Sequence, residues 1–112
     1  MLAAVAILIA NNMKLKKDLS RMTIEDARNA LRRGEFSSEE LTRAYLERIR
    51  SRDGRLNAYL TVADEVALEQ AAAADKRIAA GDDTPLLGIP VAVKDIIITK
   101  DVPSTAGSKI LE

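Results

Sequence analysis

The stretch Leu87-Gly-Ile-Pro-Val-Ala-Val93, followed by Lys94-Asp95, decides how this chain is expected to fold. It is apolar at nearly every position, and its branched side chains favour strands. A continuous apolar run of this length is typical of a strand buried on both faces, in a sheet that helices cover. Ile96-Ile97-Ile98 resumes the strand pattern, whereas residues 103–108 are rich in Ser, Thr, Gly and Pro and predict a loop. We therefore expect an α/β fold with one or two strands in this chain.

Two amphipathic helices are predicted upstream of this strand. Thr23 can cap the first helix, with Asp26 three residues later, and the apolar spacing extends this helix over 24–33. Ser37-Ser-Glu-Glu40 is a clearer capping box. It opens a second helix over 38–51, whose apolar side chains recur at helical spacing and whose charged side chains take the outer face.

The chain between these helices and the strand has a second set of signals. Asp53-Gly54 predicts a turn, and residues 58–61 predict a short strand. The alanine-rich run from Ala63 to Ala80 predicts a third helix. Gly81 is its natural C-terminal cap, and residues 82–85 predict a loop.

Composition limits the chemistry that the chain can perform. The 112 residues are 47% apolar, but eighteen of them are alanine and only three are aromatic, so a core of this chain alone would be thin. Seventeen basic residues balance seventeen acidic ones, which argues against a broad nucleic-acid footprint. The absence of Cys and His excludes disulfides, thiol nucleophiles, Cys/His zinc sites and a Ser-His-Asp triad within these residues. Proton transfer here has to use Lys, a carboxylate, Tyr or Ser.

The first ten residues, Met1-Leu-Ala-Ala-Val-Ala-Ile-Leu-Ile-Ala10, form an uncharged run. The run is too short to cross a bilayer, which takes about 20 residues. Lysines follow the run instead of preceding it, unlike the pattern of a secretory signal peptide. We interpret residues 1–18 as an N-terminal extension from a start codon upstream of the true one, at Met13 or Met22. A weakly membrane-associating or partner-binding helix is the alternative.

Lys94 is the candidate for catalysis, because a lysine desolvated beside Val93 and the isoleucines loses pKa and can act as a base. The alternative is a lysine at a strand end that reaches solvent. The hydroxyl-rich loop 103–108 could bind an anion through backbone donors or form ordinary turns. Gly88 is interpreted as a conformational device.

The arginines of the two predicted upstream helices have two interpretations. Arg32-Arg33 and the trio Arg48, Arg50 and Arg52 fit solvated helix faces. Contact with a tRNA backbone is the alternative, and the balanced net charge gives it no support.

Several blocks of this chain, in order and spacing, resemble the amidase signature family. The block Leu87–Asp95 is similar to that family's first catalytic segment, G-I-P-x-A-x-K-D. Within the family, the chain is most similar to the A subunits of the aspartyl/glutamyl-tRNA amidotransferases. The blocks that carry this narrower resemblance are Thr99-Lys-Asp-Val-Pro-Ser-Thr-Ala-Gly-Ser-Lys-Ile-Leu-Glu112, Leu19–Ala27, Leu31–Leu41 and Leu56–Leu60. The resemblance implies that residues 19–112 are the N-terminal portion of an amidase domain, truncated before the Gly/Ser-rich signature, with a mixed sheet covered by helices.

The resemblance also implies a mechanism. Family members hydrolyse amides with a Ser–cis-Ser–Lys triad, in which Lys94 would take a proton through the bridging serine. The A-type polypeptide would release ammonia from glutamine, while a partner polypeptide uses ATP and Mg²⁺ to activate misacylated Glu-tRNA(Gln) or Asp-tRNA(Asn). The resemblance thus implies the B and C subunits as partners, no cofactor on this chain, no membrane and a cytoplasmic location.

This sequence departs from the family pattern in three respects. Both triad serines lie beyond residue 112, so this chain alone is expected to be inactive. Ile96 stands where asparagine is common, and Asp101 replaces a frequent glycine, which adds modest strain if φ is positive there. Two alternatives remain open on the sequence: another amidase-signature hydrolase of small amides, and a non-catalytic module whose helices bind a partner.

Overall fold

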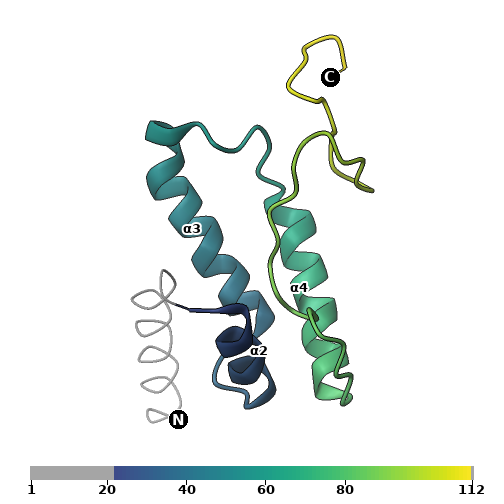
Figure 1. Cartoon of the computed structure of the whole chain (residues 1–112). Coiled ribbons are helices and arrows are strands. Elements are labelled where there is room, and N and C mark those ends of the chain that lie inside the picture. The colour runs from purple at the N-terminus through teal and green to yellow at the C-terminus, as the bar shows by residue number, and fades with distance from the viewer. Residues whose placement is uncertain (1–21, 112) are drawn as a thin grey trace.

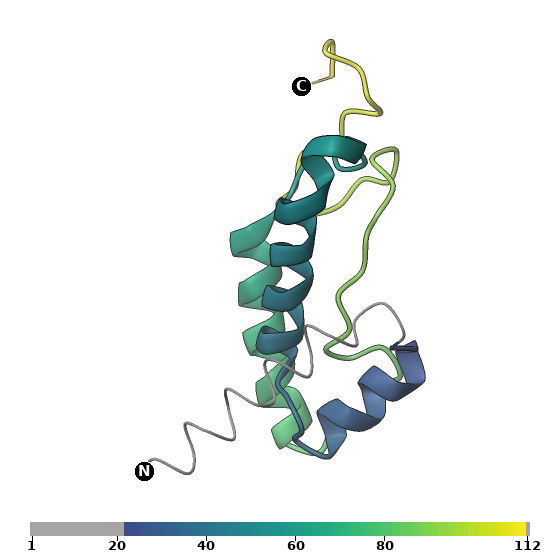
Figure 2. The same ribbon diagram turned by 90° about the vertical axis from the view of Figure 1, so that its left-hand side faces the viewer.

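The computed structural model describes residues 22–111 of the chain. Three helices form in this part: α2 (Ile24–Arg32), α3 (Ser38–Leu56) and α4 (Asp64–Ala79). Helices α3 and α4 lie side by side and antiparallel, and α2 crosses near the N-terminal end of α3 (Figures 1 and 2). The segment after α4 returns along that helix and ends in loops beyond it (Figure 1). No helix among these residues is both long enough and apolar enough to cross a membrane.

Helix α2 confirms the prediction over 24–33 and the capping box that opens it. The Asp26 N–H donates to the Thr23 hydroxyl at 3.1 Å, and the Thr23 N–H donates to the Asp26 carboxylate at 3.0 Å. Two of the backbone donors that a helix start leaves free are therefore satisfied. The helix ends at Arg32 because Gly34 then takes a left-handed φ of +67°.

Helix α3 begins at the predicted Ser37 cap but runs to Leu56, through Asp53 and Gly54. The turn predicted at Asp53-Gly54 is wrong, because one glycine inside a helix costs only about 1 kcal/mol relative to alanine. Asp53 instead supports the later end of the helix. Its carbonyl accepts from the Asn57 N–H at 2.7 Å, and its carboxylate accepts from the Ala58 N–H at 2.7 Å. Asn57 is the left-handed C-terminal cap, with φ of +49°.

Helix α4 confirms the alanine-rich helix predicted from Ala63 to Ala80. It has no side-chain cap at its start, and Gly81 follows its end with φ of +88°. Ala71 and Ala74 are the buried residues of α4, the helix that packs against α3. Their small side chains allow the two helices to approach closely.

One buried junction fastens both long helices to the segment that follows them. Asp75 on α4 accepts hydrogen bonds from the Ser38 N–H at 2.7 Å and the Glu39 N–H at 3.1 Å, and so caps the start of α3 from outside. The Ser38 hydroxyl donates to the Gly88 carbonyl at 2.8 Å, and Ser38 is only 2% exposed. Three parts of the chain that are distant in sequence therefore meet at Ser38.

Gly88 has to be glycine at this junction. Its φ is +82°, and an added Cβ would lie 3.0 Å from Ile78 Cδ1 and 3.2 Å from Leu31 Cδ1. The sequence interpretation of Gly88 as a conformational device is confirmed. The residue lets the chain bend where it lies against all three helices, at Leu31 of α2, Ser38 of α3 and Ile78 of α4.

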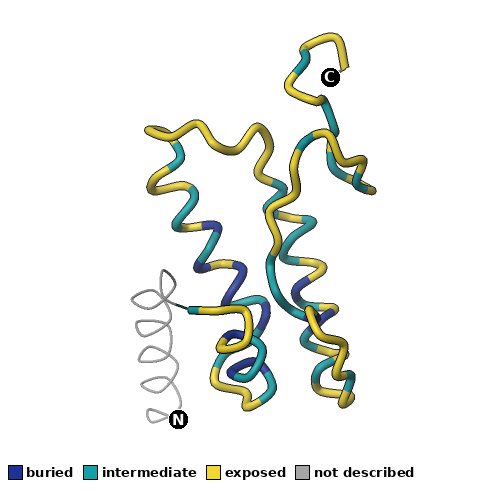
Figure 3. The backbone as a smooth tube through the Cα atoms, viewed as in Figure 1, coloured by how far each residue is buried: buried dark blue, intermediate teal, exposed yellow. Residues whose placement is uncertain are grey.

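The small core lies where α2 crosses the first half of α3, and the far end of the molecule is exposed (Figure 3). Its buried members are Ala27, Leu31, Leu41 and Ala44. The loop over 82–85 is held to α2 because Asp83 forms ion pairs with Arg28 and Arg32.

The strands predicted over 58–61, 87–93 and 96–98 are wrong for the part of the chain that the structure describes, which contains no strand. A strand needs a neighbour to complete its hydrogen-bond ladder, and residues 22–111 offer the extended segment none. An isolated bridge between Thr99 and Val102 is the nearest approach to pairing. The burial on both faces that was expected of residues 87–93 is also wrong here, since Val91 is 69% and Val93 is 51% exposed. These residues contain the helices of the expected fold but not its sheet. The predictions for residues 1–18 lie outside the described residues.

Gly88→Ala is expected to lower the free energy of unfolding by about 2 kcal/mol, because it adds both backbone strain and a steric contact. Gly81→Ala is the matched control, since Gly81 also has positive φ but no atom within 4 Å of an added Cβ. Urea unfolding followed by circular dichroism measures both variants. Equal losses would show that the close approach at Gly88 costs nothing.

Asp75→Ala is expected to lower the free energy of unfolding by about 1–2 kcal/mol, because it removes the acceptor of two backbone donors at the start of α3. Glu69→Ala on the same helix serves as control, since Glu69 is exposed. The same unfolding assay compares the two. A loss no larger for Asp75→Ala than for Glu69→Ala would contradict the cap.

Candidate functional site

Lys94 follows the extended segment and stands at the start of a turn. Its carbonyl accepts from the Ile97 N–H at 2.9 Å, and its side chain is exposed. The neighbouring apolar side chains do not cover it and are themselves exposed, Val93 to 51% and Ile96 to 62%. Within the described residues, Lys94 therefore fits the second sequence interpretation, a lysine whose side chain reaches solvent. Its catalytic role stays a prediction.

Asp95, the next residue, is the acceptor around which the hydroxyl-rich loop folds. Its carboxylate accepts from the Thr105 N–H at 3.0 Å, the Thr105 hydroxyl at 2.6 Å and the Gly107 N–H at 3.0 Å. Its carbonyl accepts from the Ala106 N–H at 3.1 Å. The side chain and the main chain of one residue thus hold three consecutive loop residues.

The backbone N–H groups of the loop therefore bind an anion, which is the carboxylate of Asp95 in the same chain. Ala106 and Gly107 have φ of +51° and +70°, which turns the backbone N–H groups toward the carboxylate. The Thr105 hydroxyl, then the backbone N–H groups of Thr105 and Gly107, hold the pKa of Asp95 below its usual value of 3.8. The sequence pattern indicated backbone donors in this loop but did not reveal Asp95 as their acceptor.

The other hydroxyls of the loop also bond to backbone. Ser104 donates to the Ile97 carbonyl at 3.1 Å and accepts from the Thr99 N–H at 3.4 Å. Ser108 accepts from the Ile110 N–H at 3.4 Å. Neither serine has a hydrogen bond to Lys94 among the described residues. The serines thus agree with the interpretation of ordinary turns, while the loop's backbone donors at Thr105 and Gly107 are taken by Asp95 and binding of an external anion stays untested.

Asp101 adopts φ of +63° in the tight turn between Thr99 and Val102. The positive φ on which the expected strain depended is therefore present. Aspartate tolerates the left-handed conformation better than most residues, so the strain is modest.

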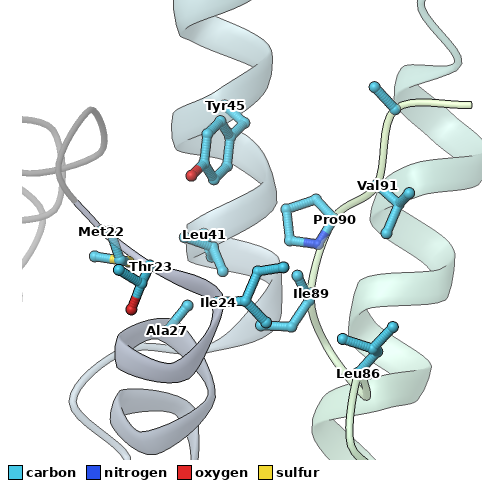
Figure 4. A pocket seen from close by; sticks show the side chains of 11 residues that line it. Met22, Thr23, Ile24, Ala27, Leu41, Tyr45, Leu86, Ile89, Pro90 and Val91 are labelled. Carbon is cyan, nitrogen blue, oxygen red and sulfur yellow. The ribbon is translucent and has the colours of Figure 1, made fainter.

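An apolar groove of about 360 Å³ lies between the start of α2, the first half of α3 and the segment after α4, and Lys94 is not among the residues that line it (Figure 4). Ile24 and Leu41 line one side and Ile89 and Pro90 the other, with the Tyr45 ring above them (Figure 4). The lining holds no carboxylate, lysine, arginine or serine, and its polar side chains are those of Thr23 and Tyr45. Within residues 22–111, no three His, Cys, Asp or Glu side chains gather as metal ligands.

Several arginines on the helices form ion pairs at the surface. Arg43 bonds to Glu39 at 2.6 Å one turn away on α3, and Arg50 pairs with Asp64 at the start of α4. Exposed pairs of this kind contribute at most about 1 kcal/mol. Arg33 and Arg50, whose side chains are 59% and 62% exposed, agree with the interpretation of solvated helix faces, whereas the Arg32 side chain is only 22% exposed and pairs with Asp83. A tRNA contact stays an untested alternative.

Comparison with known proteins places this sequence in a family. The family model named Amidase matches residues 40–112, which is more than half of the chain. Three similar proteins are each named as the A subunit of a glutamyl-tRNA(Gln) amidotransferase. They come from Geobacter metallireducens (54% identical over 85% of this chain and 20% of the relative), Desulforapulum autotrophicum (52%, over 85% and 19%) and a Roseiflexus species (52%, over 84% and 19%). The chain thus spans about a fifth of the length of these relatives. No solved structure matches this one closely enough to count as a relative.

Acidification is expected to release the loop from Asp95. Because the folded loop lowers the pKa of this carboxyl, the stability it contributes is complete above the ordinary value of 3.8 and is lost as pH falls through the lower, folded pKa. The amide proton shifts of Thr105 and Gly107, followed by ¹⁵N-edited NMR from neutrality downward, should share one midpoint below 3.8. The Ile89 amide, which donates to the Leu86 carbonyl outside this turn and loop, is the internal control. A midpoint at or above 3.8 would contradict the hydrogen bonding of the loop to the ionised Asp95 carboxylate.

Proposed function

This chain belongs to the amidase family, and on that premise we propose that residues 19–112 are the N-terminal portion of the ammonia-releasing polypeptide of a tRNA-dependent amidotransferase. The observation that carries the proposal is the identity of about one half to several proteins named as A subunits of glutamyl-tRNA(Gln) amidotransferases. The Lys94 block lies inside the family match. The sheet of the expected α/β fold then belongs to the complete amidase domain.

Lys94 is the catalytic base in this proposal. It would accept a proton from a bridging serine, which in turn activates the serine that attacks the amide carbonyl of glutamine. An unprotonated amine is needed for that step, and burial beside apolar groups lowers the pKa of a lysine. Val93 and Ile96, which flank Lys94 and its neighbour Asp95, are exposed here and supply the apolar surface that a covered site would use.

The rest of the reaction is assigned to partners. A further polypeptide of the complex, together with ATP and Mg²⁺, would activate Glu-tRNA(Gln) or Asp-tRNA(Asn), and the released ammonia would complete the amide. In this division of labour the present chain binds neither ATP nor Mg²⁺. The B and C subunits are the proposed partners, glutamine is the proposed substrate, and the cytoplasm is the proposed location.

A chimera tests the catalytic role of Lys94. Residues 19–112 replace the matching segment of the Geobacter metallireducens relative, and ammonia release from glutamine is measured in the assembled enzyme. Lys94→Ala is expected to lower kcat by about 1,000-fold or more, because it removes the base from the proton relay. Lys100→Ala is the control, since Lys100 is also an exposed lysine but lies outside the G-I-P-x-A-x-K-D block. An active Lys94→Ala chimera would overturn the role.

The 112-residue polypeptide assayed alone is expected to release no ammonia. Ser104 is bonded to the Ile97 carbonyl, and neither it nor Ser108 is hydrogen-bonded to Lys94. Neither hydroxyl of this loop is therefore paired with the base that would activate it. Ammonia release by the purified chain that Lys94→Ala abolishes would contradict this expectation.

A further inference from the structure

We propose that Asp95 is a positioning residue, whose carboxylate gathers the loop of residues 104–107 and thereby fixes the turn that carries Lys94. The inference rests on the proposed function, since it assigns Asp95 a part in the chemistry of Lys94. Its basis is the set of contacts that join the two segments.

Most of the hydrogen bonds between Asp95 and the loop are accepted by the Asp95 carboxylate. Three donors from Thr105 and Gly107 converge on its two carboxylate oxygens at 2.6–3.0 Å. Bonds to an ionised acceptor are roughly twice as strong as bonds between neutral groups. The fourth bond, from the Ala106 N–H to the Asp95 carbonyl, joins the main chains of the two segments directly.

The same loop holds the turn at its other end. Ser104 bonds to the Ile97 carbonyl and to the Thr99 N–H, while the Ile97 N–H bonds to the Lys94 carbonyl. The backbone from Lys94 to Thr99 is therefore fastened at both ends to the loop that follows it. No helix or strand of the described residues performs this task, because residues 94–98 belong to neither.

A fixed backbone is the first requirement for placing the amine of Lys94. Its side chain is exposed and has four rotatable bonds, so the amine can be aligned only if the Cα that carries it is held in place. A displacement of about 1 Å can cost about 100-fold in rate when a reacting group has to meet its partner. Loss of the Asp95 bonds would free the turn without removing any group that reacts.

Asp82 provides a matched control for this assignment. Its carboxylate also accepts from the N–H and the hydroxyl of a threonine, Thr84, at 3.0 and 2.6 Å. These bonds, together with one from Arg77, lower the pKa of Asp82 to about 2. Asp82 lies in the loop after α4, so the same loss of charge there should leave the Lys94 turn unchanged.

The first test uses the 112-residue chain and ¹⁵N relaxation by NMR. Asp95→Asn should lower the heteronuclear NOE of Lys94, Ile97 and Thr105 to values typical of a mobile loop, whereas Asp82→Asn should leave them unchanged. Thr105→Ser, which keeps a hydroxyl, should behave as the original chain does. If Asp95→Asn leaves the NOE of Lys94 unchanged, the positioning role is wrong, whatever the function of the chain.

The second test uses the chimera and separates kcat from KM. Asp95→Asn should lower kcat by about 10- to 100-fold with KM nearly unchanged, because the alignment of the base is lost while glutamine binding is kept. Asp82→Asn should keep the kcat of the unaltered chimera. If Lys94→Ala is inactive but Asp95→Asn matches Asp82→Asn, the positioning role fails and the proposed function stands. An active Lys94→Ala chimera overturns the proposed function itself.

Discussion

The structure depends first on the hydrogen bonds that meet at Ser38. A helix start exposes backbone donors that have to be satisfied, and here Asp75 on α4 satisfies two of them at the start of α3. The Ser38 hydroxyl then binds the Gly88 carbonyl and brings the chain after α4 back against the core. Because the apolar core is small, these polar contacts determine which helices pack together and where the last third of the chain begins.

The segment that starts at Gly88 is held at its two ends and exposed in between. Gly88 is packed among Ile78, Leu31 and Ser38, while Asp95 is bonded to Thr105 and Gly107 in the loop that follows the turn at Lys94. Val91 and Val93 lie between these anchors and are exposed. The two anchors hold the backbone that carries Lys94. The apolar residues beside the lysine remain exposed and can pack against the remainder of an amidase domain.

The helices could be predicted from the sequence because their signals are local. A hydroxyl at Thr23 or Ser37 and an acid three residues later are enough to specify a helix start. The end of α3 was missed, since Asp53-Gly54 resembles a turn until the bonds that Asp53 accepts from the residues after the helix are known.

The strands and the role of Asp95 could not be predicted in the same way. The strands were mispredicted because apolar, β-branched residues report a preference that only a partner strand can satisfy. Asp95 was missed because its partners lie ten and twelve residues away, and no local pattern links an acid to such a loop. Both cases depend on contacts between distant parts of the chain, which spacing alone does not reveal.

The most direct test of the catalytic role is the distance from Lys94 Nζ to the nearest serine hydroxyl in a crystal structure of the chimera. We predict a hydrogen bond of about 2.6–3.2 Å, with Asp95 still bonded to Thr105 and Gly107. A Lys94 side chain that remains in solvent within the complete, active domain would contradict the claim that this turn presents the catalytic base.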